Sequence, residues 1–174
     1  MSKANQVTNV VIAGLGGQGA IRISDILSDA AFRVGYDIKK SEIHGMSQRG
    51  GSVSSDVRFG PKVYSPMVPP GEADFLIVLH PTQVDNNLHH LRKGGVLITT
   101  DLILKEGQDF KDLDADTSNP LTERNCNVCL LGFLSTYLDI DESAWLPAIY
   151  DNLPKKVHEQ NAAVFEYGRN LRKD

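Results

Sequence analysis

The chain of 174 residues has few cysteines, no excess of basic residues and no long apolar run. Its two cysteines, Cys126 and Cys129, form one Cys-x-x-Cys pair. A metal or iron–sulfur site normally needs four ligands, and a redox dithiol lies at an exposed helix start. Because the adjoining segment 128–134 is apolar, we expect both thiols to be inert core side chains.

The charge balance argues against a nucleic-acid partner, and the short apolar runs argue against a membrane span. There are 18 basic and 22 acidic side chains, which give a formal net charge of -4, and no basic stripe suggests a nucleic-acid partner. The longest apolar run, 128–134, is far shorter than the ~20 residues of a membrane span, and the N-terminus has no signal-peptide layout. We therefore expect a cytoplasmic protein with no nucleic-acid or membrane partner, and its length predicts a single domain, residues 1–174.

The most informative segment is a glycine-rich loop between the apolar run 9–13 and a helical pattern. A strand that ends in glycines and enters a helix directs backbone N–H groups and the positive end of a helix dipole at a bound anion. The same loop could also serve only to let the strand and the helix pack closely. The candidate ligand-binding residues of this loop are Gly14, Gly16, Gly17, Gln18 and Gly19.

A second candidate loop follows the next predicted strand. Asp37 and Glu42 occupy about the position of the acidic residue that holds the ribose of NAD or FAD, but such sites do not require the segment that follows. An arginine fork grips carboxylate or phosphate, and glycines permit close approach. In the alternative interpretation Arg49 pairs with Glu42 or with a partner subunit, and His44 fills a turn. The candidates here are His44, Arg49, Gly50 and Gly51.

The apolar periodicity predicts an α/β fold with one doubly wound, mostly parallel sheet, helices on both faces and a short antiparallel edge hairpin (Rossmann-like). The two candidate loops and His80 are expected at the carboxyl ends of its strands, although His80 could be a hydrogen-bonded strand-end residue. His89 and His90 are expected in solvent. No catalytic constellation and no metal-ligand spacing is present. Strands are predicted over 9–13, 36–41, 53–59, 75–79 and 96–100, and residues 63–64 are expected to pair back on 53–59. Helices are predicted over 18–34, 127–138, 141–153 and 154–171, and a further helix is predicted to begin at 81. The segment 101–123 is expected to be irregular with one short strand.

Several motifs resemble one protein family. They are Gly14-x-Gly16-Gly17-Gln18-Gly19, the segment 39–53 with His44-Gly45-Met46-Ser47-Gln48-Arg49-Gly50-Gly51 at its centre, Asp56-Val57-Arg58, and the segments 127–132 and 161–168. Together they closely resemble the gamma-type subunit of 2-oxoacid:ferredoxin oxidoreductases. The version of the motif at 44–51 is most similar to the indolepyruvate-type members of that family.

The resemblance implies a subunit of an enzyme that decarboxylates a 2-oxoacid, in this case indolepyruvate or another aryl pyruvate. The acyl group passes to coenzyme A and the electrons pass to ferredoxin. Thiamine diphosphate and iron–sulfur clusters are then carried by a large partner subunit, and this chain binds no cofactor tightly. It would support assembly and the anion site on the coenzyme A side, and it would be inactive in isolation.

Two further expectations concern partners. Met46, Met67 and Val68 lie in predicted loops, which indicates an apolar surface that a large subunit covers and that would drive homodimerisation or aggregation of the isolated chain. The competing hypothesis is a stand-alone nucleotide-binding or NAD(P)-dependent redox protein. That hypothesis leaves the segment 44–51 unexplained.

Overall fold

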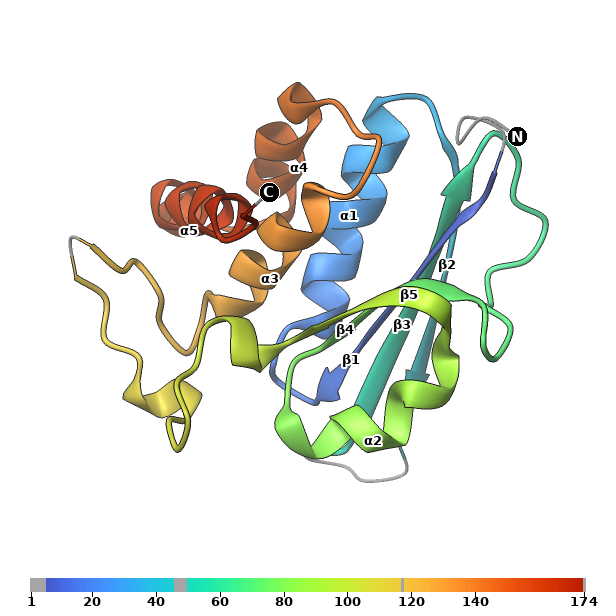
Figure 1. Cartoon of the computed structure of the whole chain (residues 1–174). Coiled ribbons are helices and arrows are strands. Elements are labelled where there is room, and N and C mark those ends of the chain that lie inside the picture. The colour runs from blue at the N-terminus through green and yellow to red at the C-terminus, as the bar shows by residue number, and fades with distance from the viewer. Residues whose placement is uncertain (1–5, 46–49, 117, 174) are drawn as a thin grey trace.

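The computed structural model describes residues 6–45, 50–116 and 118–173. A five-stranded sheet in the order β2-β3-β1-β4-β5 forms its centre (Figure 1). The strands are β1 (Thr8–Leu15), β2 (Asp37–His44), β3 (Ser52–Gly60), β4 (Ala73–Val78) and β5 (Leu91–Thr99). The helices are α1 (Ala20–Arg33), α2 (Val84–Asn87), α3 (Cys126–Ser135), α4 (Trp145–Asn152) and α5 (His158–Asn170). None of the helices in these ranges is long and apolar enough to cross a membrane.

The sheet confirms the α/β class but is mixed rather than mostly parallel. β1 runs parallel to β4 and β4 parallel to β5, whereas β3 runs antiparallel to both β1 and β2. The connection 45–51 explains this, because it is far shorter than the dozen or so residues that a parallel crossover needs. The edge hairpin is therefore β2–β3. The predicted pairing of 63–64 is wrong: the Val63 N–H instead donates to Asp37 Oδ2 at 2.8 Å.

The main core lies between the sheet and a layer of four helices, α1, α3, α4 and α5, which Figure 1 shows together on one side of the sheet. Alternate residues of β1, Val10 and Ile12, point into this core and are fully buried. Helix α3 is buried along its entire length. It packs against α5 at Gly132 and Gly168, where an added Cβ would overlap the backbone of the other helix.

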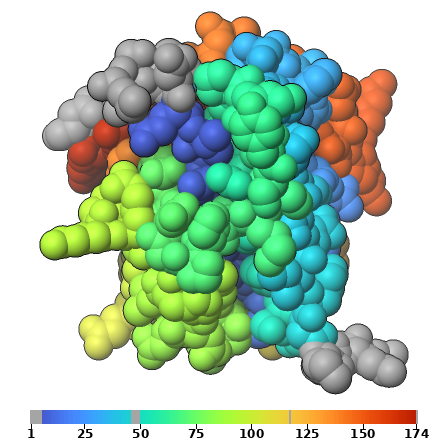
Figure 2. Space-filling view, turned by 90° about the vertical axis from the view of Figure 1, so that its right-hand side faces the viewer, coloured from blue at the N-terminus to red at the C-terminus, as the bar shows by residue number. Residues whose placement is uncertain are grey.

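The opposite face of the sheet carries a smaller core. Val11 and Leu76 are covered there by the segment 61–72, which Figure 2 shows lying across this face, and by the short helical turns of 81–90. Val68 belongs to this cluster and is only 4% exposed, so its assignment to a partner-facing surface is wrong. Met67 is exposed as expected, and Met46 lies outside the described residues.

Two other expectations fail in this part of the chain. His90 is half-buried rather than solvated, because its turn packs against β4. The described residues of 101–123 contain short helical turns at Thr100–Leu102 and Phe110–Asp112 and no strand.

The three C-terminal helices lie within one to four residues of the predicted ranges, and the Asp141 side chain accepts the N–H of Ser143 as the predicted cap.

Candidate functional site

The two glycine-containing loops meet at one edge of the sheet. The Gly16 N–H donates to the Gly51 carbonyl oxygen at 2.8 Å. Two antiparallel pairings make β2 run in the same direction as β1, so β1 ends beside the β2–β3 hairpin, with Leu15 opposite Ser52. The predicted juxtaposition of the 14–19 and 44–51 loops is therefore present in the part of both loops that the structure describes.

The first loop has the backbone of an anion cradle. Gly17 and Gly19 have φ of +89° and +83°, a region that strongly favours glycine. A Cβ added at Gly17 would meet nothing within 4 Å, so the space above the loop is open. Gly19 caps α1 without a side-chain bond, and within the described chain no acceptor faces the N–H groups of Ala20, Ile21 and Arg22. These N–H groups are free to bind an anion.

An open cleft of about 490 Å³ lies beside this loop. Four of the predicted residues line it: Gly16, Gly17, Gly19 and His44. Arg22, Asp25 and Asn152 also line it and were missed from the sequence. Arg22 could have been found, since it follows the last glycine of the loop by one helical turn. Asn152 could not, because only the packing of α4 against α1 brings it there.

Other predicted residues support the cleft rather than line it. The Gln18 side chain folds back and its Oε1 accepts the Leu15 N–H at 2.8 Å, which closes the loop on itself. A Cβ on Gly14 would lie 2.9 Å from that oxygen and 3.0 Å from the Cβ of Leu79, so Gly14 is needed for packing. Gly50, with φ of +65°, and Gly51 abut Gly16. Arg49 lies outside the described residues.

The charged side chains around the cleft are fixed by partners. Arg22 Nη1 donates to the Asn152 carbonyl oxygen at 2.8 Å. Lys40 bridges Asp25 and Glu42; partial burial works against its charge, but the two carboxylates outweigh this and raise its pKa. Glu42 Oε2 also lies 3.9 Å from His44 Nε2. The arrangement offers backbone donors and cationic side chains to an anion, and its described residues contain no nucleophile–base pair.

His80 does not join this cleft. Its Nδ1 lies 2.7 Å from Thr82 Oγ1 and accepts the Thr82 N–H, so it is the hydrogen-bonded strand-end residue of the alternative interpretation. The interpretation of Cys126 and Cys129 as core thiols is confirmed, because both are buried and burial raises the pKa of each to about 12. Among the described residues, no cluster of three or more potential metal ligands occurs.

Comparison with known proteins gives the family. The model of the pyruvate ferredoxin/flavodoxin oxidoreductase family matches residues 9–171. The chain belongs to this family. Among its relatives, the indolepyruvate oxidoreductase subunit IorB of Thermococcus kodakarensis is 46% identical over 91 residues, 52% of this chain and 45% of that protein. IorB of Methanothermobacter thermautotrophicus is 28% identical over 188 residues, 92% of this chain and 95% of that protein.

Solved structures of other proteins share the fold of this chain. The gamma subunit of a keto/oxoacid ferredoxin oxidoreductase from Geobacter sulfurreducens matches with a TM-score of 0.75 and 23% identity, covering 95% of this chain and 96% of that one. The 2-oxoglutarate:ferredoxin oxidoreductase of Magnetococcus marinus, solved with 2-oxoglutarate, coenzyme A and succinyl-CoA, matches with a TM-score of 0.77 and 19% identity over 96% of this chain and 31% of that chain. The chain spans about half the length of IorB from Thermococcus kodakarensis and from Pyrococcus horikoshii.

Proposed function

We propose that this chain is the gamma-type subunit of a 2-oxoacid:ferredoxin oxidoreductase that acts on indolepyruvate or a related aryl pyruvate. The complex would decarboxylate the 2-oxoacid, transfer the acyl group to coenzyme A and reduce ferredoxin. The chain would help assemble the complex and bind a phosphate of coenzyme A in the cleft at Gly16–Gly19. The observation that carries this proposal is the hydrogen bond from Gly16 to Gly51, which joins two family motifs beside helix-start N–H groups that have no acceptor within the described chain.

The relatives favour this choice of substrate and ligand. IorB of Thermococcus kodakarensis and IorB of Methanothermobacter thermautotrophicus are named as subunits of an indolepyruvate oxidoreductase. Coenzyme A is bound in the structure from Magnetococcus marinus. The cleft fits a phosphate, because it combines free backbone donors with Arg22 and leaves the space above Gly17 open. A stand-alone NAD(P)-dependent enzyme is disfavoured, because it would not explain the 44–51 motif of this family.

An iron–sulfur cluster does not fit the described residues. Only Cys126 and Cys129 could supply thiolates, and both are buried with a strongly raised pKa. A cluster normally needs four such ligands. We therefore assign the clusters to a large partner subunit, through which ferredoxin is reduced. As the family resemblance implies, we place thiamine diphosphate on the same subunit. We assign the assembled enzyme to the cytoplasm. In this proposal residues 1–174 act as one domain.

The test uses the complex reconstituted with its large subunit. Arg49→Ala should raise the KM for coenzyme A about tenfold, because it removes a charge-assisted bond to a phosphate. Arg49→Lys should recover little, since a point charge does not replace a planar fork. Arg33→Gln is the matched control: Arg33 is bound to Asp29 and Asp151 at the far end of α1. An unchanged KM in Arg49→Ala would remove this residue from the ligand site, and dissociation of the complex with unchanged coenzyme A dependence would assign it to the subunit interface.

A further inference from the structure

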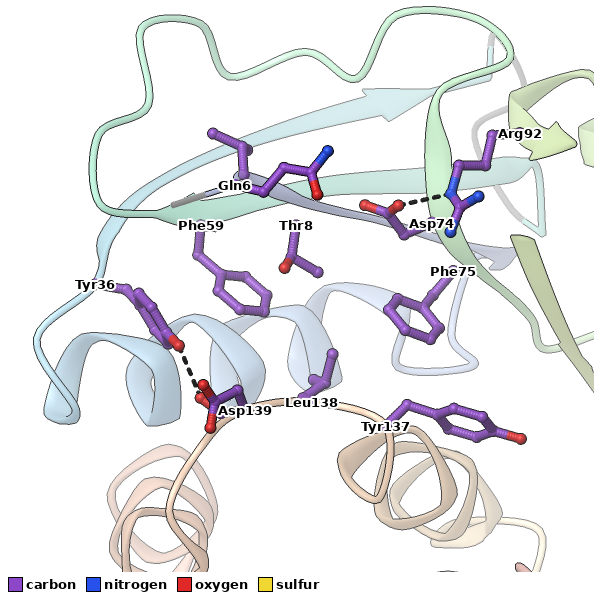
Figure 3. Close-up of a pocket in the computed structure, with 11 residues that line it drawn as sticks. Gln6, Thr8, Tyr36, Phe59, Asp74, Phe75, Arg92, Tyr137, Leu138 and Asp139 are labelled. Carbon is purple, nitrogen blue, oxygen red and sulfur yellow. Dashed lines mark hydrogen bonds and ion pairs between the residues drawn. The ribbon is translucent and has the colours of Figure 1, made fainter. Parts of the chain in front are cut away.

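A second hollow opens at the edge of the sheet opposite the glycine loops. It has a volume of about 190 Å³ and lies between the amino ends of β1 and β4 and the turn that follows α3 (Figure 3). Its position separates it from the cleft at Gly16–Gly19 by the whole length of the strands. Neither the family motifs nor the proposed function accounts for it.

Aromatic side chains form two walls of this hollow. Tyr36 and Phe59 pack with ring centroids 5.4 Å apart, and Phe75 and Tyr137 with centroids 5.7 Å apart. Figure 3 shows Phe59 and Phe75 pointing from the strands toward the helical layer. The guanidinium of Arg172 covers the Tyr137 ring at 3.9 Å from its centroid and holds it in place. The walls therefore favour a flat aromatic group, which packs edge-to-face or offset against such rings.

The rim of the hollow carries one fixed negative and one fixed positive group. Asp74 Oδ1 accepts from Arg92 Nε at 2.7 Å, and Asp74 Oδ2 accepts from the Asn9 N–H at 2.8 Å. Arg92 Nη1 donates to the Lys93 carbonyl oxygen at 3.2 Å. In the described ranges no acceptor faces Arg92 Nη2, and each carboxylate oxygen of Asp74 keeps a second lone pair. Both groups can thus bind a further ion without breaking their own pair.

We propose that this hollow binds a free aromatic α-amino acid. Its ring lies between the Tyr36–Phe59 and Phe75–Tyr137 pairs, its ammonium group lies on Asp74 and its carboxylate on Arg92. An α-amino acid carries its ammonium group next to its carboxylate, and the rim carries Asp74 next to Arg92. Each charge of the ligand therefore meets a group of opposite charge, and both ionic contacts form together. A purely apolar ligand would leave the rim charges unused, and a simple anion would make no use of the rings. At the far end, the Tyr36 hydroxyl donates to the Asp139 carbonyl oxygen at 2.9 Å and closes the wall.

The proposal is tested by titrating the full chain with L-phenylalanine and L-tryptophan, followed by calorimetry and by the NMR signals of the aromatic rings. We expect saturable binding in the millimolar range, as for a small ligand with few polar contacts. L-alanine lacks the ring, 3-phenylpropionate lacks the ammonium group and phenethylamine lacks the carboxylate. Each should bind about tenfold more weakly or not at all.

Two variants make the result specific to this hollow. Arg92→Gln, at an exposed side chain, should weaken L-phenylalanine binding about tenfold, whereas Arg33→Gln on α1 should leave it unchanged. Phe75→Leu should weaken binding while circular dichroism and the unfolding midpoint confirm the fold. The proposal is overturned if neither amino acid binds saturably, if phenethylamine binds as well as L-phenylalanine, or if Arg92→Gln has no effect. Because these assays need neither coenzyme A nor the large subunit, their outcome is independent of the proposed function.

Discussion

Gly16 and Gly51 are joined by one backbone hydrogen bond of 2.8 Å, although 34 residues separate them in the chain. The bond fixes the loop after β1 against the loop that leads into β3. The start of α1 and the end of β2 line the same open cleft. A change in either loop is therefore expected to affect the geometry of both.

Substitution of the two left-handed glycines should separate backbone strain from crowding. Gly17→Ala is expected to cost about 1 to 3 kcal/mol of stability through strain alone, since no atom lies within 4 Å of the added Cβ. Gly19→Ala has nearly the same φ but also drives a Cβ into the Asn127 amide, so it should cost more. Urea unfolding measures both. The further substitution Asn127→Ala should reduce the additional destabilisation that Gly19→Ala shows over Gly17→Ala. Equal costs for Gly17→Ala and Gly19→Ala would contradict the packing at Asn127.

Arg22 should contribute to the anion site through its charge. In the reconstituted complex, Arg22→Gln is expected to raise the KM for coenzyme A about three- to tenfold with a smaller effect on kcat, because it removes ground-state binding. Steady-state titration of coenzyme A measures this. Arg33→Gln serves again as the control on the same helix. A fall in kcat at unchanged KM would instead place Arg22 in assembly or positioning.

The contact between α3 and α5 predicts a reversal of ordinary helix propensity. Gly→Ala in an exposed helix stabilises by about 1 kcal/mol. Gly168→Ala should instead destabilise by about 2 kcal/mol or more, since its Cβ would overlap the Cys129 carbonyl group. Chemical denaturation is the measurement, and Ala163→Gly on the exposed side of α5 calibrates the propensity term at about 1 kcal/mol of loss. A stable Gly168→Ala protein would show that the two helices are farther apart than described.

His90 should make the fold less stable in mild acid. Burial, followed by the neighbouring His89, lowers its pKa, and these effects outweigh Asp56, which raises it. The unfolded chain therefore binds the proton first, at its ordinary value near 6.5, and the stability that neutral His90 provides is lost as the pH falls below that value. His90→Gln should reduce this loss in thermal unfolding between pH 7 and about pH 5.

Asp56 provides the control for the pH experiment because its effect has the opposite sign. Burial raises its pKa despite the Val68 N–H bond and His90, so the folded chain protonates it before the unfolded chain does. Its contribution to stability therefore increases as the pH falls. The effect of His90→Gln should persist in the Asp56→Asn background. If the loss of folding stability at low pH disappears with Asp56→Asn but not with His90→Gln, the assignment to His90 is wrong.

The amino-acid sequence determined the local elements and the two loops. The strand–glycine–helix pattern at 9–19 required a loop of left-handed glycines, and apolar periodicity located α1 and the C-terminal helices, because these features depend on neighbouring residues. The 39–53 motif indicated the family, because it is a continuous run of residues that can be recognised without the tertiary structure. Buried thiols at 126 and 129 followed from the apolar segment beside them.

Only the tertiary structure decided how the strands pair and which distant groups share a site. The short 45–51 connection forced β3 to run antiparallel, and this mixed sheet, not local propensity, brought Gly51 to Gly16. Asn152 reached the cleft through helix packing, and Val68 was buried because its segment crosses the second face of the sheet. Contacts between residues far apart in the chain depend on the packing of whole layers, for which a one-dimensional pattern carries no signal.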